Sequence, residues 1–295
     1  MKPVMHYSIE DLIRGGEKEP EIEGMSYKSA RDELFFVVGE MRSMCGERHD
    51  KFKIRMIHLC EKSIVPRDVY TAPEGMYLED VCHIAFSDTL LVFRSNIDPN
   101  SGEYKSKLLV AFNRYDEEWL ETHCVETTGN KCYALGESQV LVGDYKHLEV
   151  YSMKSGLGFE FLYRIDLSLA YSFLATKPGS DTIVATCTYD GIVRVHQLSE
   201  RKLEELARIQ LQAANDLIWL PERILIVWKR ATNASERDAV IELEFDGELI
   251  QRRRELTIEL KHQLWASLIW CAAGDGFAIA DASACQLDYF SFASA

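Results

Sequence analysis

Two neighbouring cysteine–histidine pairs, Cys82-His83 and His123-Cys124, offer the nitrogen and sulfur donors that zinc prefers. A zinc site needs four such donors in a tetrahedron. Both pairs fall in predicted strands, where consecutive side chains point to opposite faces of the sheet. Each pair can therefore give only one ligand to a common metal, and the pattern favours core or surface residues over a zinc site.

Patterns for nucleophilic catalysis are incomplete. Residues 136–140 begin like a nucleophile elbow, but Val140 stands where the last glycine is needed. No glycine-rich phosphate loop and no Cys-x-x-Cys pair occurs. Several cysteines lie in apolar runs, where cysteine behaves as a small buried hydrophobe. We expect reduced thiols and no disulfide among the 8 cysteines, which are Cys45, Cys60, Cys82, Cys124, Cys132, Cys187, Cys271 and Cys285.

An Asp-Gly pair between two β-branched, apolar runs marks the clearest structural element. Asp190-Gly191 lies in the connection between residues 180–186 and 192–198, and this pair tolerates the positive φ angles of a tight hairpin turn. The opening of the hairpin, a small or acidic turn followed by an apolar run, recurs along the chain. The copies start at Arg31, Ser87, Gly136, Ser180, Pro221 and Gly274. Their mean spacing of about 49 residues is typical of propeller blades or solenoid units.

Four short strands can be placed in most units, which predicts an all-β, six-bladed β-propeller with four-stranded antiparallel blades. Residues 203–211 could also form a helix face, but their place in the repeat favours a strand. A solenoid would need capping repeats at both ends. We expect a single domain over 1–295, with an N-terminal segment at 1–22 and blades at 23–72, 80–127, 131–168, 171–212, 213–258 and 265–292.

The sixth unit lacks a fourth strand, because only three residues follow Phe292. An open third strand would be an exposed edge, which sheet proteins avoid. We therefore predict that residues 3–8 supply the outer strand of the last blade, with Val4 and His6 on one face and Met5 and Tyr7 on the other. In the alternative arrangement, residues 8–14 form a helical turn and the last blade keeps three strands.

The charge balance is acidic, with 33 Lys and Arg against 47 Asp and Glu and a net charge of −14. Nucleic acid and anionic lipid both attract clustered cations, so this balance opposes either as a partner. It favours a protein partner with a basic surface. The N-terminal residues show no secretory apolar core, and no apolar run is long enough to span a bilayer. We expect a cytoplasmic monomer.

The tract from Asp190 to His196 resembles the third strand of a WD-repeat blade, although the Gly-His and Trp-Asp pairs of that family are missing. Six blades with variable loops, over about residues 23–292, are more similar to the broad group of NHL-repeat and SMP-30-type propellers. This resemblance implies a propeller fold and a range of functions rather than one function.

Lactonases of the SMP-30 type imply a further possibility, because they hold a divalent cation on the ring axis with Glu, Asn and Asp side chains from the innermost strands. The matching positions here hold Glu23, Asp80, Asn215 and Asp216. Such oxygen ligands would suit Ca²⁺. The other units have Lys131, Tyr171 and Trp265 at these positions, and none of them is a natural calcium ligand. The simpler interpretation is that the acids cap strand ends in a solvated channel.

Two functions remain open from the sequence. The first is a non-enzymatic scaffold without a cofactor that presents variable polar loops on a rigid ring to a protein partner. The alternative is a divalent-metal-dependent hydrolase or lactonase with calcium in the central channel.

Overall fold

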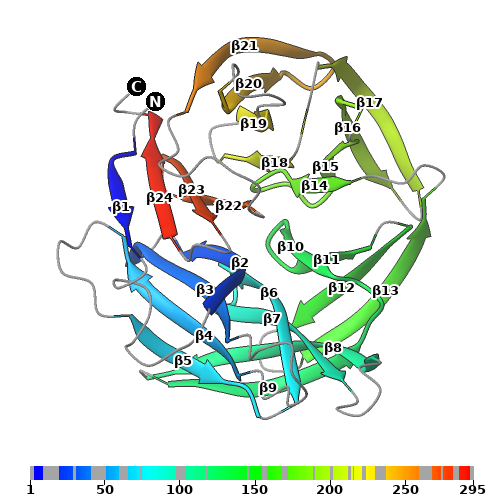
Figure 1. The fold of residues 1–295 in the computed structure, drawn as a ribbon. Coiled ribbons are helices and arrows are strands. Elements are labelled where there is room, and N and C mark those ends of the chain that lie inside the picture. Colours follow the sequence, from blue (N-terminus) through cyan, green and yellow to red (C-terminus); the bar gives the residue numbers. More distant parts are fainter. Residues whose placement is uncertain are drawn as a thin grey trace.

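Six four-stranded antiparallel sheets are arranged as blades around a central axis (Figure 1), which confirms the predicted all-β propeller. The structure is a computed structural model. It describes residues 3–8, 20–28, 31–40, 51–59, 66–73, 75–97, 104–116, 118–144, 146–154, 158–167, 172–188, 190–199, 202–211, 214, 216–220, 224–229, 237–258, 268–273, 275–281 and 286–292. Within these ranges, no helix has the length and apolar character needed to cross a membrane.

Each blade runs from an innermost first strand at the axis to an outermost fourth strand (Figure 1). The first strands are β2 (Pro20–Lys28), β6 (Met76–Ile84), β10 (Lys131–Leu135), β14 (Phe173–Thr176), β18 (Asp216–Trp219) and β22 (Leu268–Ala273). The second strands are β3 (Glu33–Glu40), β7 (Thr89–Ile97), β11 (Gln139–Gly143), β15 (Ile183–Cys187), β19 (Ile224–Lys229) and β23 (Gly276–Asp281).

The third strands are β4 (Lys51–His58), β8 (Tyr104–Tyr115), β12 (His147–Lys154), β16 (Ile192–Ser199), β20 (Ala239–Phe245) and β24 (Gln286–Ser291). The outermost strands are β5 (Arg67–Thr71), β9 (Glu118–Glu126), β13 (Gly158–Asp166), β17 (Lys202–Gln210), β21 (Ile250–Thr257) and β1 (Met5–Tyr7). The ambiguous residues 203–211 therefore lie in a strand, β17, except for Leu211. The Asp-Gly hairpin is also confirmed, since β15 and β16 pair on either side of Gly191, whose φ is 84°.

The second strands are buried on both faces, which explains why they read as continuous apolar runs. In β3, Leu34 and Phe36 pack in a cluster shared with blade 6, whereas Phe35 and Val37 pack in a cluster shared with blade 2. The same alternation gives one apolar cluster at each of the six blade junctions in the described residues. Strand alternation thus holds neighbouring blades together instead of separating a core face from a solvent face.

The N-terminus closes the ring, as predicted. β1 pairs antiparallel with β24, with Met5 opposite Tyr289, and the amide of Val4 donates to the carbonyl of Tyr289 at 2.8 Å. The buried ring of Tyr7 packs in the cluster between blades 6 and 1, and its hydroxyl donates to the Sδ of Met5 at 3.2 Å. The alternative helical turn at 8–14 lies outside the described residues, except for Ser8.

A β-bulge interrupts each of the five longer outer strands, two or three residues from the end of the third strand that pairs with it. The extra residues are Val69, Thr122, Leu162, Leu206 and Arg253. A bulge twists an edge strand and disrupts its row of free hydrogen-bonding groups. The outer strands are therefore poor templates for pairing with another sheet.

Ring closure can be tested by comparing Tyr7→Ala with Val4→Ala. Tyr7 is 4% exposed in the closing cluster, and its truncation should lower the free energy of unfolding by about 3 kcal/mol. Val4 lies in the same segment but is 51% exposed, so its truncation should change stability by less than about 0.5 kcal/mol. Urea unfolding of the two variants measures both values. Equal, small effects would show that the segment does not hold the ring closed.

Candidate functional site

The carboxylates predicted to lie near the ring axis are on innermost strands. Glu23 is the extra residue of a bulge in β2, and Asp80 lies in a wider bulge of β6 next to Glu79. Asp216 is the first residue of β18. The fourth predicted ligand, Asn215, lies outside the described residues.

Glycine is required beside the bulge of β2. A Cβ atom on Gly24 would lie 2.4 Å from Oδ1 of Asp80 and 2.8 Å from its Cα. Both distances are shorter than van der Waals contact, so a larger residue would push β6 away from β2. Gly24 therefore allows the backbone that carries Asp80 to approach blade 1 closely.

The two adjacent acids of the β6 bulge have different surroundings. Glu79 accepts hydrogen bonds from Ser95 and from Lys107, whose Nζ lies 2.6 Å away. Burial raises the pKa of Asp80 from 3.8 to about 6, with a smaller contribution from Asp216 of blade 5. Lys131 of blade 3 and the hydrogen bond from the Val81 amide lower this pKa, but they do not offset the burial. Asp80 can therefore exchange a proton near neutral pH.

Three thiols on innermost strands, Cys82, Cys132 and Cys271, interact with this carboxyl or with one another. Burial raises the pKa of Cys271 to about 12 and that of Cys132 well above its usual value, and in both cases Asp80 and Cys82 add to the effect. Such thiols are protonated and unreactive at neutral pH. All the cysteines in the described ranges are free thiols, as expected, while Cys45, Cys60 and Cys285 lie outside them.

The two residues of each cysteine–histidine pair point to opposite faces of their strand, so each pair can offer only one ligand to a common zinc ion. Cys82 packs in the cluster between blades 2 and 3, whereas the ring of His83 bonds to Asp88. Cys124 is exposed and His123 packs against Gly158. Across the residues that the structure describes, no group of three or more His, Cys, Asp or Glu side chains could hold a metal ion.

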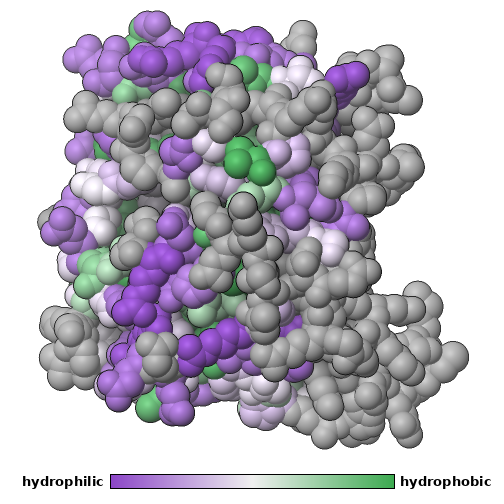
Figure 2. All heavy atoms as spheres, turned by 90° about the vertical axis from the view of Figure 1, so that its left-hand side faces the viewer, coloured by the Kyte–Doolittle hydropathy of each residue, from purple (hydrophilic) through white to green (hydrophobic). Residues whose placement is uncertain are grey.

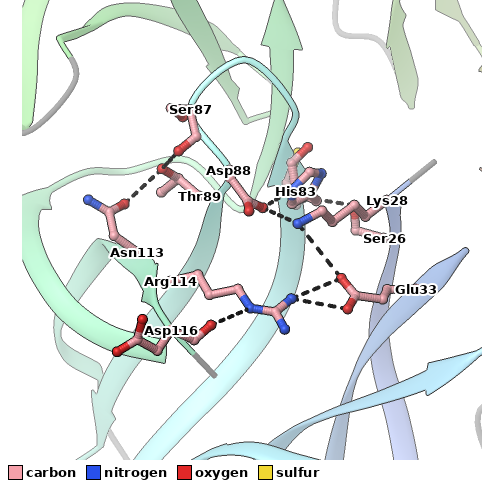
Figure 3. A network of polar contacts seen from close by, with 11 residues as sticks. Ser26, Lys28, Glu33, His83, Ser87, Asp88, Thr89, Asn113, Arg114 and Asp116 are labelled. Atoms are coloured by element: carbon pink, nitrogen blue, oxygen red, sulfur yellow. Dashed lines mark hydrogen bonds and ion pairs between the residues drawn. The ribbon is translucent and has the colours of Figure 1, made fainter. Parts of the chain in front are cut away.

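A second polar site, which the sequence did not reveal, lies at the junction of blades 1 and 2 (Figure 3). Lys28 at the end of β2 contacts Asp88 in the turn before β7, and its Nζ lies 3.7 Å from Glu33. Arg114 of β8 reaches across to Glu33 at 3.1 Å. Lys28 and Glu33 are buried. Two cations and two carboxylates thus form a chain of ion pairs that joins the two blades.

His83 extends this chain toward β2. Its amide donates to Oγ of Ser26 at 2.8 Å, and its Nε2 lies 3.0 Å from Oδ1 of Asp88. Burial lowers the pKa of His83, which favours the neutral ring. A neutral ring must carry its proton on Nε2 here, because a carboxylate can only accept. The pKa of Asp88 is lowered even though burial opposes ionisation, because Lys28 and His83 both donate to it.

An aromatic side chain completes the junction. Trp119 of β9 lies within 6.0 Å of the Lys28 ammonium and within 5.9 Å of the Arg114 guanidinium, so both cations face its ring. Phe35 packs edge-on against the same ring at 5.5 Å. The positive and negative charges of this arrangement balance, and it joins blade 1 to blade 2. We call it the clamp; its residues are Lys28, Glu33, Asp88, Arg114 and Trp119.

The clamp predicts a large cost for Glu33→Gln. Removing this charge leaves Lys28 and Arg114 with insufficient compensation in a buried site, and the free energy of unfolding should fall by about 3 kcal/mol. Glu204→Gln is the matched control, because Glu204 pairs with Lys202 on the surface, where a pair contributes about 0–1 kcal/mol. Guanidinium unfolding measures both. A cost for Glu33→Gln as small as that of the control would contradict the clamp.

Asp80 predicts a pH-dependent gain in stability for Asp80→Asn. A folded-state pKa of about 6, above the unfolded value, means that wild-type stability falls as the pH rises from about 4 to 6. The variant lacks this loss and should be more stable than the wild type by about 1–3 kcal/mol at pH 8, with no difference at pH 4. Unfolding from pH 4 to 8 in EDTA tests this. Asp181→Asn changes an exposed carboxylate and should show no such trend; a pH-independent effect of Asp80→Asn would contradict the assignment.

Comparison with known proteins gives the fold alone. No protein family matches the sequence, and no curated protein is significantly similar to it. A chain in "Crystal Structure of Mitotic Checkpoint Complex" superposes with a TM-score of 0.56 at 10% identity, covering 98% of this chain and 94% of that one. Sqt1 from Chaetomium thermophilum gives 0.47 at 9% identity, covering 86% and 74%. The similarity to the chain in the mitotic checkpoint complex concerns the fold alone. The NHL-repeat and SMP-30-type subgroup stays a prediction.

Proposed function

We propose that this protein is a non-enzymatic scaffold that binds a protein partner through the outside of its propeller. The observation that carries the proposal is the placing of exposed apolar side chains. Four of the six large exposed ones in the described residues lie on blades 2 and 3, namely Tyr115, Leu120, Phe161 and Leu162. Contiguous exposed apolar surface marks interaction sites, and Phe161 and Leu162 are adjacent residues of β13.

Two further points support a protein partner. The similar chain in the mitotic checkpoint complex comes from an assembly of proteins, and a ring of this shape offers such an assembly a rigid surface. The net charge of −14 favours a partner with a basic surface. We further propose that the chain is a monomer apart from this partner and that it is cytoplasmic, where its thiols would stay reduced.

Purification of the tagged full-length chain from its own cells tests the scaffold. We expect a partner that co-elutes in a fixed ratio and forms the same complex when both proteins are purified and mixed. Failure to obtain any reconstituted complex would overturn the scaffold. Size-exclusion chromatography with light scattering measures the mass of the complex against the 33.8 kDa of the chain alone.

The calcium-dependent hydrolase remains a second candidate because Asp80, which has a raised pKa, interacts with Asp216 near the ring axis. A ligand that binds only the folded state raises the melting temperature as its concentration exceeds Kd. The scaffold predicts the same melting temperature in 5 mM EDTA and in 5 mM CaCl₂, a calcium concentration about 5,000-fold above a micromolar Kd. Stoichiometric calcium in the purified protein, with a large loss of thermal stability in EDTA, would favour the hydrolase.

A further inference from the structure

Four of the five bulged outer strands share one feature at their exposed edge. The residue just before the bulge is charged and takes part in an ion pair. The pairs are Asp68 with Arg55 at 2.8 Å, Glu121 with Arg94 at 2.7 Å, Glu205 with Arg194 at 3.3 Å, and Arg252 with Glu255. A charge at this place keeps an edge strand hydrated and discourages pairing with other chains.

Blade 3 departs from this pattern. Phe161 stands before its bulge and Leu162 is the bulged residue, and they are 53% and 39% exposed. The rings of Phe161 and Tyr151 pack in a T-shaped arrangement with their centroids 5.7 Å apart, and about half of Phe161 stays exposed to solvent. By contrast, the described residues on the face shown in Figure 2, which includes blade 6, are mostly hydrophilic with small, separate hydrophobic areas. The outer edge of blade 3 therefore exposes apolar surface where its neighbours carry charge.

This apolar edge lies in acidic surroundings. β13 contacts β9 of blade 2, since a Cβ on Gly158 would lie 2.4 Å from the ring of His123. Together the two strands carry five carboxylates and one guanidinium, and the guanidinium, Arg164, already pairs with Asp166 and Glu149. The outer strand of blade 5 is the opposite, with three arginines and one glutamate. Among the outer strands, β9 and β13 thus combine exposed apolar groups with excess negative charge.

We propose that the outer edge of blade 3 binds a segment of the partner protein in which an apolar side chain is flanked by lysine or arginine. The apolar side chain packs on Phe161 and Leu162, and the flanking cations face the carboxylates of β9 and β13. An exposed aromatic anchor supplies affinity, while the charges speed association and select against acidic segments. This inference rests on the proposed scaffold function and names the chemistry of its partner.

A labelled peptide with a Phe-Leu centre and three lysines on each side is the probe, measured by fluorescence anisotropy with the full chain. We expect saturable binding that weakens with salt and falls at least 10-fold in Phe161→Glu. That substitution introduces the type of residue that blades 2 and 4 have at this place, as Glu121 and Glu205. Leu249→Glu is the matched control, since Leu249 is also half exposed but lies in blade 5, and it should leave binding unchanged.

Several results would overturn the assignment: no saturable binding up to about 1 mM, equal binding to Phe161→Glu, equal loss in Leu249→Glu, or equal binding of a peptide with an Ala-Ala centre. If Phe161→Glu does not fold, which thermal melting shows, Phe161→Ser replaces it under the same criteria. A purified partner that binds wild type and Phe161→Glu with the same affinity would reject this edge and leave the scaffold intact. The scaffold itself fails only if no partner forms a complex.

Discussion

In each blade the second strand is buried between the two neighbouring blades, and the rest of the structure depends on this constraint. Because Leu34 and Phe35 each need a different blade to cover them, no blade can bury its apolar surface alone. Burial on this scale dominates folding, so the blades are stable only as a closed set. The ion-pair clamp strengthens the junction of blades 1 and 2 in a ring that apolar packing already holds together.

Features with a local pattern could be predicted from the sequence. Continuous apolar runs after acidic turns located the second strands, and the need to cover the edge of the last blade assigned its outer strand to residues 3–8, which contain β1. The prediction also placed Glu23, Asp80 and Asp216 on innermost strands. Features that depend on register could not be predicted. A bulge shifts the pairing of a strand by one residue, but it changes the hydrophobic pattern of the sequence too little to be recognised there.

The two polar sites show the same limit. The clamp joins residues from β2, β3, β8 and the turn before β7, and no spacing in the sequence relates them. The sequence indicated only that Asp88 lies in a turn, and its φ of 47° confirms this. Nothing in the turn pattern indicated that Asp88 would pair with Lys28. Similarly, the bulges of β2 and β6 bring Asp80 close to Gly24. Both sites follow from three-dimensional packing and not from local preference.

The pairing of β1 with β24 has a consequence for the order of folding. His6 and Asp288, whose side chains meet at 2.7 Å, are separated by 282 positions in the chain. Contacts between such distant residues form late, because a long loop must close before they are gained. At about 5–20 residues per second, a ribosome needs on the order of half a minute to synthesise the intervening chain. During that time β1 has no partner strand, so the ring can close only after β24 has been synthesised.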